Sequence, residues 1–193
     1  EYIAEAEVLH IMGSALAVSE SSRQAVYKAV EIAVEEGIKI SFDPNLRPEL
    51  MGVERIREVC SPILEKASIV MPSKAEAVPF TYTEDPLESA KRLVEKGAEI
   101  AVIKLGAEGS IAASQDEVVR VPAYKVVEVD PTGAGDVFDA AFIVAQLKGW
   151  SLEEGLRFAN AAGAIKVTRF GPMEGPTSFN EVVDFMRKKG LRV

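Results

Sequence analysis

The chain has 193 residues, of which 22 are Lys or Arg and 30 are Asp or Glu, giving a formal net charge of −8 and an isoelectric point near 4.9. This balance argues against a general nucleic-acid binder, because neutralising phosphates requires a surplus of basic side chains. With 48% hydrophobic and 27% charged residues, the composition is that of a globular protein. The length fits one compact domain over residues 1–193.

Cysteine and histidine each occur once, as Cys60 and His10. An intrachain disulfide and a zinc site of the usual spacing are therefore excluded, and a cytoplasmic location is expected. No apolar run approaches the roughly 18 to 20 residues of a membrane span, and no secretion signal opens the chain. Because the first residue is Glu1, we expect the chain to begin inside a longer reading frame.

Short β-branched runs alternate with helical periodicity in the first half, which predicts βαβ units and a mostly parallel sheet. Strands are expected at 8–12, 38–42, 68–71 and 99–105. Between them, helices are expected from the N-cap Ser19 to Gly37, from 53 to 60 with a break near Pro62, and from 86 to 96. Gly13-Ser14 is expected to be a loop.

The pattern changes after residue 105. Three short β-branched segments, 110–113, 118–121 and 126–129, have no helices between them, which predicts antiparallel hairpins at one edge of the sheet. Helices are expected at 134–148, 151–167 and 178–188. The fold class is therefore α/β.

The segment Asp130-Pro-Thr-Gly-Ala-Gly-Asp136 carries the strongest chemical signal. Small residues allow a sharp turn, and the helix that follows would direct its unpaired N–H groups and its positive dipole end at one anion. Asp136, in the first turn, could accept a proton from a nearby hydroxyl. The alternative is a glycine-rich turn in which Asp136 only complements the helix dipole.

Other segments support the same kind of site. Lys104 to Ser110 is a second glycine-spaced loop at the end of a strand, where open α/β sheets bind ligands. Residues 160–164 would offer a small-residue helix face to a flat ring. A hairpin turn and close helix packing are the respective alternatives.

Taken with the loop Asp43-Pro-Asn-Leu-Arg47, these segments resemble the carboxyl-terminal part of the ribokinase family of sugar kinases, also called the PfkB family. The stretch from Asp130 to Phe142 resembles the family's second signature. The resemblance implies a three-layer ribokinase-like fold with a mostly parallel central sheet. It also implies that the amino-terminal third, with its β-sheet lid, is missing.

The resemblance further assigns roles to individual residues. It makes Asp136 the catalytic base and the amides of Gly133, Ala134 and Gly135 the anion hole for the transferring phosphoryl group. It implies ATP and Mg²⁺ as cofactors. The residues that would bind the nucleotide are Asn45, Lys104, Gly106, Glu108, Gly109, Gly133, Gly135 and Asn160.

Metal binding by the same resemblance involves three residues. Asp130 and Thr132 resemble a loop that in many relatives holds a monovalent cation such as K⁺. Glu76 would be linked to Mg²⁺ and its waters. The family commonly has Asn-x-x-Glu where this chain has Ser73-Lys-Ala-Glu76, so the geometry of the metal site is expected to differ.

The loop around Arg47 is similar to that of 2-keto-3-deoxygluconate kinases and their fructokinase relatives. The guanidinium of Arg47 would bind the carboxylate of an acid sugar; a phosphate contact or a structural ion pair is the alternative. The resemblance therefore implies a kinase of a sugar or sugar acid, and the composition predicts a cytoplasmic location with no nucleic-acid or membrane partner. A truncated nucleotide-binding module without catalysis is the alternative, and self-association through the apolar edge left by the lid remains open.

Overall fold

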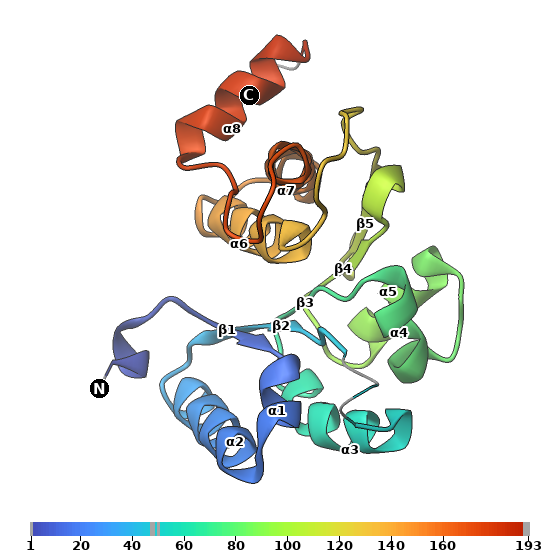
Figure 1. Ribbon diagram of the computed structural model, residues 1–193. Coiled ribbons are helices and arrows are strands. Elements are labelled where there is room, and N and C mark those ends of the chain that lie inside the picture. Colours follow the sequence, from blue (N-terminus) through green and yellow to red (C-terminus); the bar gives the residue numbers. More distant parts are fainter. Residues whose placement is uncertain (1, 47–48, 50, 191–193) are drawn as a thin grey trace. The chain divides into compact units, whose positions relative to one another are not determined.

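The computed structural model describes residues 2–46, 49 and 51–190. The chain divides into two compact units, one formed by Glu1–Ile103 with Ala112–Val118 and the other by Lys104–Ile111 with Val119–Val193. Figure 1 labels the elements of both units. We refer to them as unit 1 and unit 2 and describe each by itself.

Six strands form one sheet in the order β1 to β6. The strands β1 (Val8–Met12), β2 (Lys39–Asp43), β3 (Ile69–Val70) and β4 (Ile100–Lys104) pair in parallel, in the register Leu9 to Ile40, Phe42 to Val70 and Val70 to Ala101. The connections from β4 to β5 (Ser110–Ala113) and from β5 to β6 (Val118–Val121) are too short for a crossover, so these pairs are antiparallel hairpins. The predicted mostly parallel α/β sheet is confirmed.

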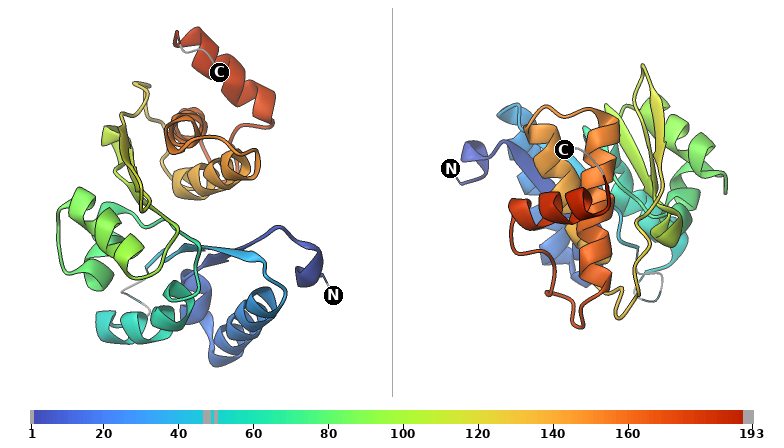
Figure 2. Two further views of the ribbon diagram at one scale, coloured as in Figure 1. Left: turned by 180° about the vertical axis from the view of Figure 1, so that it is seen from behind. Right: turned by 90° about the horizontal axis from the view of Figure 1, so that it is seen from above.

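In unit 1, helices α1 (Ser14–Val18), α2 (Glu20–Glu35) and α3 (Val53–Leu64) lie on one side of strands β1 and β2, as Figures 1 and 2 show. The Tyr27 hydroxyl donates to the Val59 carbonyl at 2.9 Å, which joins α2 to α3. Helices α4 (Lys74–Thr81) and α5 (Pro86–Glu95) pack against each other. The core of this unit contains wholly buried aliphatic and aromatic side chains, among them Leu16, Ile40, Phe42, Ile63 and Val102.

Several helix boundaries of unit 1 follow from local capping. The Ser19 hydroxyl accepts from the Ser22 amide at 3.1 Å, as predicted for an N-cap. Ser73 and Glu76 form a capping box at the start of α4, a helix that the sequence analysis missed because it is short and contains Pro79. The predicted loop at Gly13-Ser14 is wrong, since α1 begins at Ser14 and buries Leu16.

The predicted break of the helix near Pro62 is also wrong. Helix α3 continues to Leu64, and Pro62 lies in its last turn. A proline there removes one backbone hydrogen bond, which the burial of Ile63 and Leu64 offsets. Cys60, in the same helix, is 2% exposed, and desolvation raises the pKa of its thiol to about 12.

In unit 2, helices α6 (Ala134–Leu147) and α7 (Leu152–Val167) pack side by side, and α8 (Phe179–Lys188) packs on α7 (Figure 2). Trp150, between α6 and α7, lies edge-on to Phe158 and Phe179, with ring centroids 5.4 and 5.7 Å away. Trp150 therefore anchors the packing of this unit through its aromatic contacts. Phe142 and Leu156 are wholly buried between the helices.

The predicted strand at 126–129 is wrong. Residues 122–129 contain no strand, and the side chains of Val127 and Val129 are 83% and 56% exposed. A β-branched run forms a strand only where it finds a hydrogen-bonding neighbour. Instead, the amides of Val129 and Asp130 both donate to the carbonyl of Val167, at 2.7 and 3.1 Å, at the end of α7.

None of the described helices combines the length and the apolar character that crossing a membrane requires.

Candidate active site

The turn before α6 has the conformation that the glycine-rich segment predicted. Gly133 is the N-cap of α6 and has a φ of 81°. A Cβ atom built on Gly133 would lie 2.3 Å from the carbonyl oxygen of Pro172. Both the left-handed backbone and the close approach therefore require glycine at this position.

The amides at the start of α6 differ in their partners. The N–H of Ala134 donates to the Pro131 carbonyl at 3.1 Å, so the prediction that this amide belongs to an open anion hole is wrong. Among the described residues, no acceptor is found for the N–H groups of Gly133, Gly135 and Asp136. These three amides, at the positive end of a 14-residue helix, can bind an anion.

Two carboxylates on α6 have opposite environments. Asp136, in the first turn, is exposed, whereas Asp139 is 1% exposed. Asp139 accepts two hydrogen bonds from the Lys104 ammonium, at 2.9 and 3.1 Å. A Cβ placed on Gly135 would lie 3.6 Å from the same ammonium, so a positive charge lies next to the turn.

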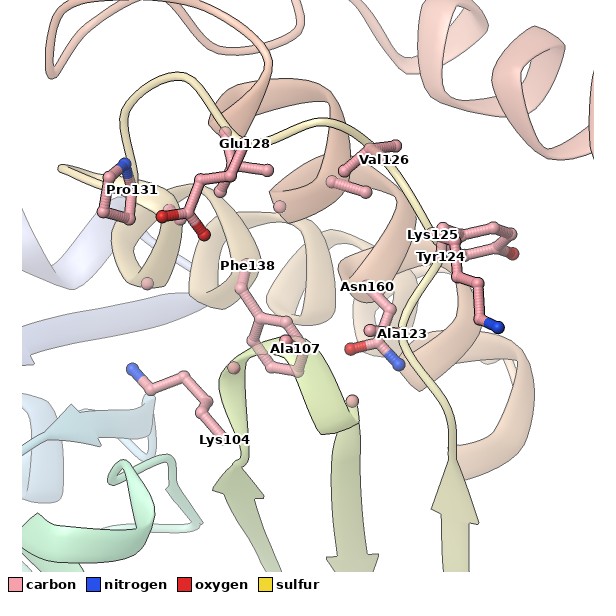
Figure 3. A pocket seen from close by; sticks show the side chains of 17 residues that line it. Lys104, Ala107, Ala123, Tyr124, Lys125, Val126, Glu128, Pro131, Phe138 and Asn160 are labelled. Carbon is pink, nitrogen blue, oxygen red and sulfur yellow. The ribbon is translucent and has the colours of Figure 1, made fainter.

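A cavity of about 530 Å³ adjoins this turn within unit 2, and Figure 3 shows the side chains around it. One wall is the loop after β4, another is the irregular segment 123–128, and the rest comes from Pro131, α6 and α7. The lining residues are Lys104, Gly106, Ala107, Gly109, Ala123, Tyr124, Lys125, Val126, Glu128, Pro131, Ala134, Gly135, Phe138, Asn160, Gly163, Ala164 and Val167.

The cavity brings together five of the predicted nucleotide-binding residues, namely Lys104, Gly106, Gly109, Gly135 and Asn160. The structure does not bring Glu108 to it. Glu108 is exposed and faces Arg120, with 3.4 Å between the carboxylate and the guanidinium. Gly163 and Ala164 line the cavity as the small-residue face of α7 indicated, and the wall at 123–128 was missed because it was assigned in part to a strand.

Asn160 is held by three hydrogen-bond partners. Its side-chain oxygen accepts from the Ser110 hydroxyl at 3.1 Å, and its nitrogen donates to the carbonyls of Val121 and Pro122 at 3.3 and 3.4 Å. These bonds tie α7 to β5 and to the end of β6. Asn160 therefore shapes the wall of the cavity and has little capacity left for a ligand.

The loop before α6 is clasped to the segment after α7. Asp130 accepts from the amides of Thr132 and Gly171, at 2.9 and 2.8 Å. Hydrogen bonds from Thr132 and from the Gly171 amide, with a smaller contribution from the charge of Lys166, lower the pKa of Asp130 to about 2.

The expected monovalent-cation site fails a direct test of fit. The Lys166 side chain is wholly buried, and its ammonium donates to the carbonyls of Asp130 and Arg169 at 2.9 and 3.3 Å. Carbonyl oxygens of this loop, the natural ligands of such an ion, already face a positive charge. Thr132 is exposed. Asp130 and Thr132 therefore do not fit K⁺ in this chain.

The remaining predicted residues belong to unit 1. Glu76 accepts from the amides of Ser73 and Leu46, at 2.8 and 3.0 Å, so it caps α4 and holds the loop after β2. Asn45 has a φ of 38°, and its amide donates to Asp43 at 3.0 Å. Arg47 lies outside the described residues. No group of three His, Cys, Asp or Glu side chains suited to a metal occurs in the described part of the chain.

Comparison with known proteins identifies the class. The model of the pfkB family of carbohydrate kinases matches residues 1–178. A 5-dehydro-2-deoxygluconokinase from Bacillus velezensis is 32% identical over 192 residues, which cover 96% of this chain and 57% of the relative. This chain belongs to the pfkB family, and it spans less than two thirds of the length of that relative.

Solved structures show the same fold. A protein from E. coli assigned as ribokinase II, in complex with ATP and Mg²⁺, has a TM-score of 0.90 and 37% identity over 97% of this chain and 60% of its own. A fructokinase double mutant from Vibrio cholerae, described as bound to fructose, ADP and a potassium ion, has a TM-score of 0.82 and 26% identity over 92% of this chain and 59% of its own. The predicted ribokinase-like fold is confirmed.

Proposed function

We propose that this chain is the nucleotide-binding part of a kinase that transfers the γ-phosphoryl group of ATP to a hydroxyl of a sugar or sugar acid. One observation carries the proposal: the exposed carboxylate of Asp136 stands on the first helical turn beside the unbonded amides of Gly133 and Gly135. A base and an anion-binding turn thus occur next to each other, at the edge of a cavity large enough for a nucleotide.

In this proposal each group has one task. The acceptor hydroxyl oxygen bonds to the γ-phosphorus as the bond to the ADP oxygen breaks, and the hydroxyl proton passes to Asp136. The amides of Gly133 and Gly135 stabilise the charge on the transferring oxygens. The Lys104 ammonium, held by Asp139, adds a fixed positive charge on the same side.

The nucleotide would occupy the cavity of unit 2. The small residues Gly163 and Ala164 leave room for a flat ring against α7, and Phe138 adds an aromatic wall. Supporting evidence is the ATP and Mg²⁺ of the E. coli structure. For Mg²⁺, Glu76 of unit 1 is the residue proposed to be linked to the ion through water. A monovalent ion at Asp130 is not part of the proposal, because Lys166 already contacts the carbonyl there.

The favoured acceptor is a deoxy keto sugar acid such as 2-keto-3-deoxygluconate, phosphorylated at its terminal hydroxyl. The name of the Bacillus relative, a 5-dehydro-2-deoxygluconokinase, supports this chemical class, and Arg47 would bind the carboxylate. Fructose, which the Vibrio fructokinase structure contains, or ribose is the alternative. ATP as co-substrate and the single buried thiol, Cys60, favour the cytoplasm.

A panel assay tests the proposal. ADP release by the complete gene product would be measured with deoxy keto sugar acids, fructose, ribose and no sugar. We expect the highest kcat/KM with a sugar acid. Turnover restricted to neutral sugars would reject the carboxylate-binding role, and ADP release unaffected by any sugar would reject the sugar kinase itself.

A non-catalytic nucleotide-binding module is the second candidate, because the residues that line the cavity proposed for the nucleotide all belong to unit 2. The 193-residue chain and the complete gene product would be compared for ATP binding and sugar phosphorylation. ATP binding by both with turnover only in the longer protein identifies this chain as the nucleotide-binding part of an enzyme. A complete gene product that binds ATP without turnover identifies a module.

A further inference from the structure

Lys166 is a lysine in an unusual position. It belongs to the last turn of α7, and its relative exposure is 0%, although lysine is rarely buried without a partner. Burying an ammonium is costly unless its hydrogen bonds are supplied. Here the carbonyl oxygens of Asp130 and Arg169 supply two of them, at 2.9 and 3.3 Å.

The two carbonyls come from segments that enclose the anion-binding turn. Asp130 begins the loop that leads to Gly133 and Asp136, and Arg169 begins the segment that follows α7. The same two segments are in contact at two further points. The Gly171 amide donates to the Asp130 carboxylate at 2.8 Å, and the backbone of Gly133 lies close to the Pro172 carbonyl. The Lys166 ammonium, a positive charge, thus bridges these two segments.

A second cation at these carbonyls would be repelled by the ammonium. Two like charges only a few ångströms apart repel each other strongly at the effective dielectric of a protein interior. The nearby Asp130 carboxylate balances one positive charge, and the Lys166 ammonium already supplies that charge. Lysine thus takes the place that an ion from solution would fill.

We propose that the Lys166 ammonium is the resident cation of the loop 130–136, and that this protein holds its anion-binding turn in place without K⁺. Lys166 is a positioning residue that acts through the backbone carbonyl of Asp130 and touches neither nucleotide nor sugar. The consequence for turnover rests on the proposed kinase function, whereas the consequence for folding does not.

The wild-type protein gives the first test. Melting temperature and the affinity for a fluorescent ATP analogue would be measured in KCl and in choline chloride at equal ionic strength, so that screening is the same. We expect equal melting temperatures and dissociation constants that agree within about twofold. A K⁺-specific rise in melting temperature or a larger gain in affinity would overturn the proposal. Absence of nucleotide binding in both salts would contradict the proposed function, and the melting comparison would still decide the cation question.

The variant Lys166→Met keeps the length of the side chain and removes the charge, and Lys188→Met, at an exposed lysine of α8, is the control. Two carbonyls that lose their donor should lower the melting temperature of Lys166→Met by about 5–10 °C in choline chloride. A melting temperature of Lys166→Met that is partly restored in KCl relative to choline chloride would show that a potassium ion replaces the ammonium, which supports the proposal. A melting temperature equal to that of the control would overturn the proposal, and if Lys166→Met does not fold, the wild-type comparison decides.

Discussion

Asp136 and Asp139 lie one helical turn apart and have different tasks because of their surroundings. Asp139 is buried and paired with the Lys104 ammonium, so its charge is committed. Asp136 is exposed beside amides that have no acceptor among the described residues, so it can meet a substrate. Of the two carboxylates, Asp136 is therefore the one that we propose accepts the proton of the substrate hydroxyl.

Replacement of that base is the most direct test at this scale. In the complete gene product, Asp136→Asn should reduce kcat by about 10² to 10⁴, because the amide cannot accept the proton. ATP affinity and the melting temperature should stay near wild type. Asp116→Asn, at an exposed carboxylate in the turn between β5 and β6, is the matched control, and unchanged turnover in Asp136→Asn would remove the assigned base.

Asp130 predicts a pH dependence of stability. Its pKa falls from 3.8 to about 2 on folding, so its hydrogen bonds stabilise the protein fully above pH 3.8, and the stabilisation is lost as the pH falls toward 2. In urea titrations between these pH values, wild type should lose stability more steeply than Asp130→Asn. Parallel curves would show that this carboxylate does not titrate with a depressed pKa.

At the scale of the element, the start of α6 depends on a turn that tolerates only glycine. Gly133→Ala should destabilise the protein by on the order of 3 kcal/mol or more, because its Cβ would meet the Pro172 carbonyl at 2.3 Å in addition to the left-handed strain. Gly149, with a φ of 73° and open space around its Cβ, gives the control. Gly149→Ala should cost only about 1 kcal/mol. Equal losses in denaturant unfolding would contradict the role of the contact with Pro172.

A substitution on the cavity-lining face of helix α7 should change nucleotide binding without changing folding. A Cβ on Gly163 would lie 3.7 Å from the Ala134 carbonyl, which is an ordinary contact. Gly163→Ala should therefore leave the ATP affinity unchanged. Gly163→Leu would fill part of the cavity and should weaken ATP binding by about tenfold or more while the protein stays folded. Titration with a fluorescent ATP analogue measures both, and equal affinities would place the nucleotide elsewhere.

The sequence predicted elements well where local signals and burial agree. The helices from Ser19, from 134 and from 151 were predictable because each combines apolar periodicity with a signal for a helix start, namely a serine N-cap at Ser19 and Ser151 and the glycine turn at Gly133. The strand at 126–129 was not, because its β-branched side chains say nothing about the absence of a neighbouring strand. The short helices α1 and α4 lack the length that periodicity requires, and α4 was detectable only through its Ser-x-x-Glu capping box.

The candidate site was predictable to the same extent. The glycine turn, Asp136 and Lys104 follow from residue type and spacing, and the structure places them at one cavity edge. The burial of Lys166 was not predictable, since it depends on where the distant loop from Asp130 passes. The bond from the Ala134 amide to the Pro131 carbonyl is local, but it depends on the backbone conformation of the turn, which residue types alone do not specify. Asn45, Arg47 and Glu76 remain predictions for the nucleotide, the sugar and the metal.

At the scale of the whole molecule, all residues that line the candidate nucleotide cavity belong to unit 2. A non-hydrolysable ATP analogue should therefore slow amide hydrogen exchange at 104–110, 123–128 and 133–137, because binding suppresses local opening. The helices α2 and α3 of unit 1 are the internal control. Protection confined to those helices would contradict the location of the nucleotide.

Because the chain divides into two units, the unfolding of each unit can be followed separately. The single thiol, Cys60, is sealed in unit 1, and the single indole, Trp150, is packed among phenylalanines in unit 2. Alkylation of Cys60 therefore reports on the unfolding of unit 1, and the fluorescence of Trp150 reports on the unfolding of unit 2, without an added label. If the halves melt cooperatively the two signals will coincide, and if one opens alone its reporter will change first.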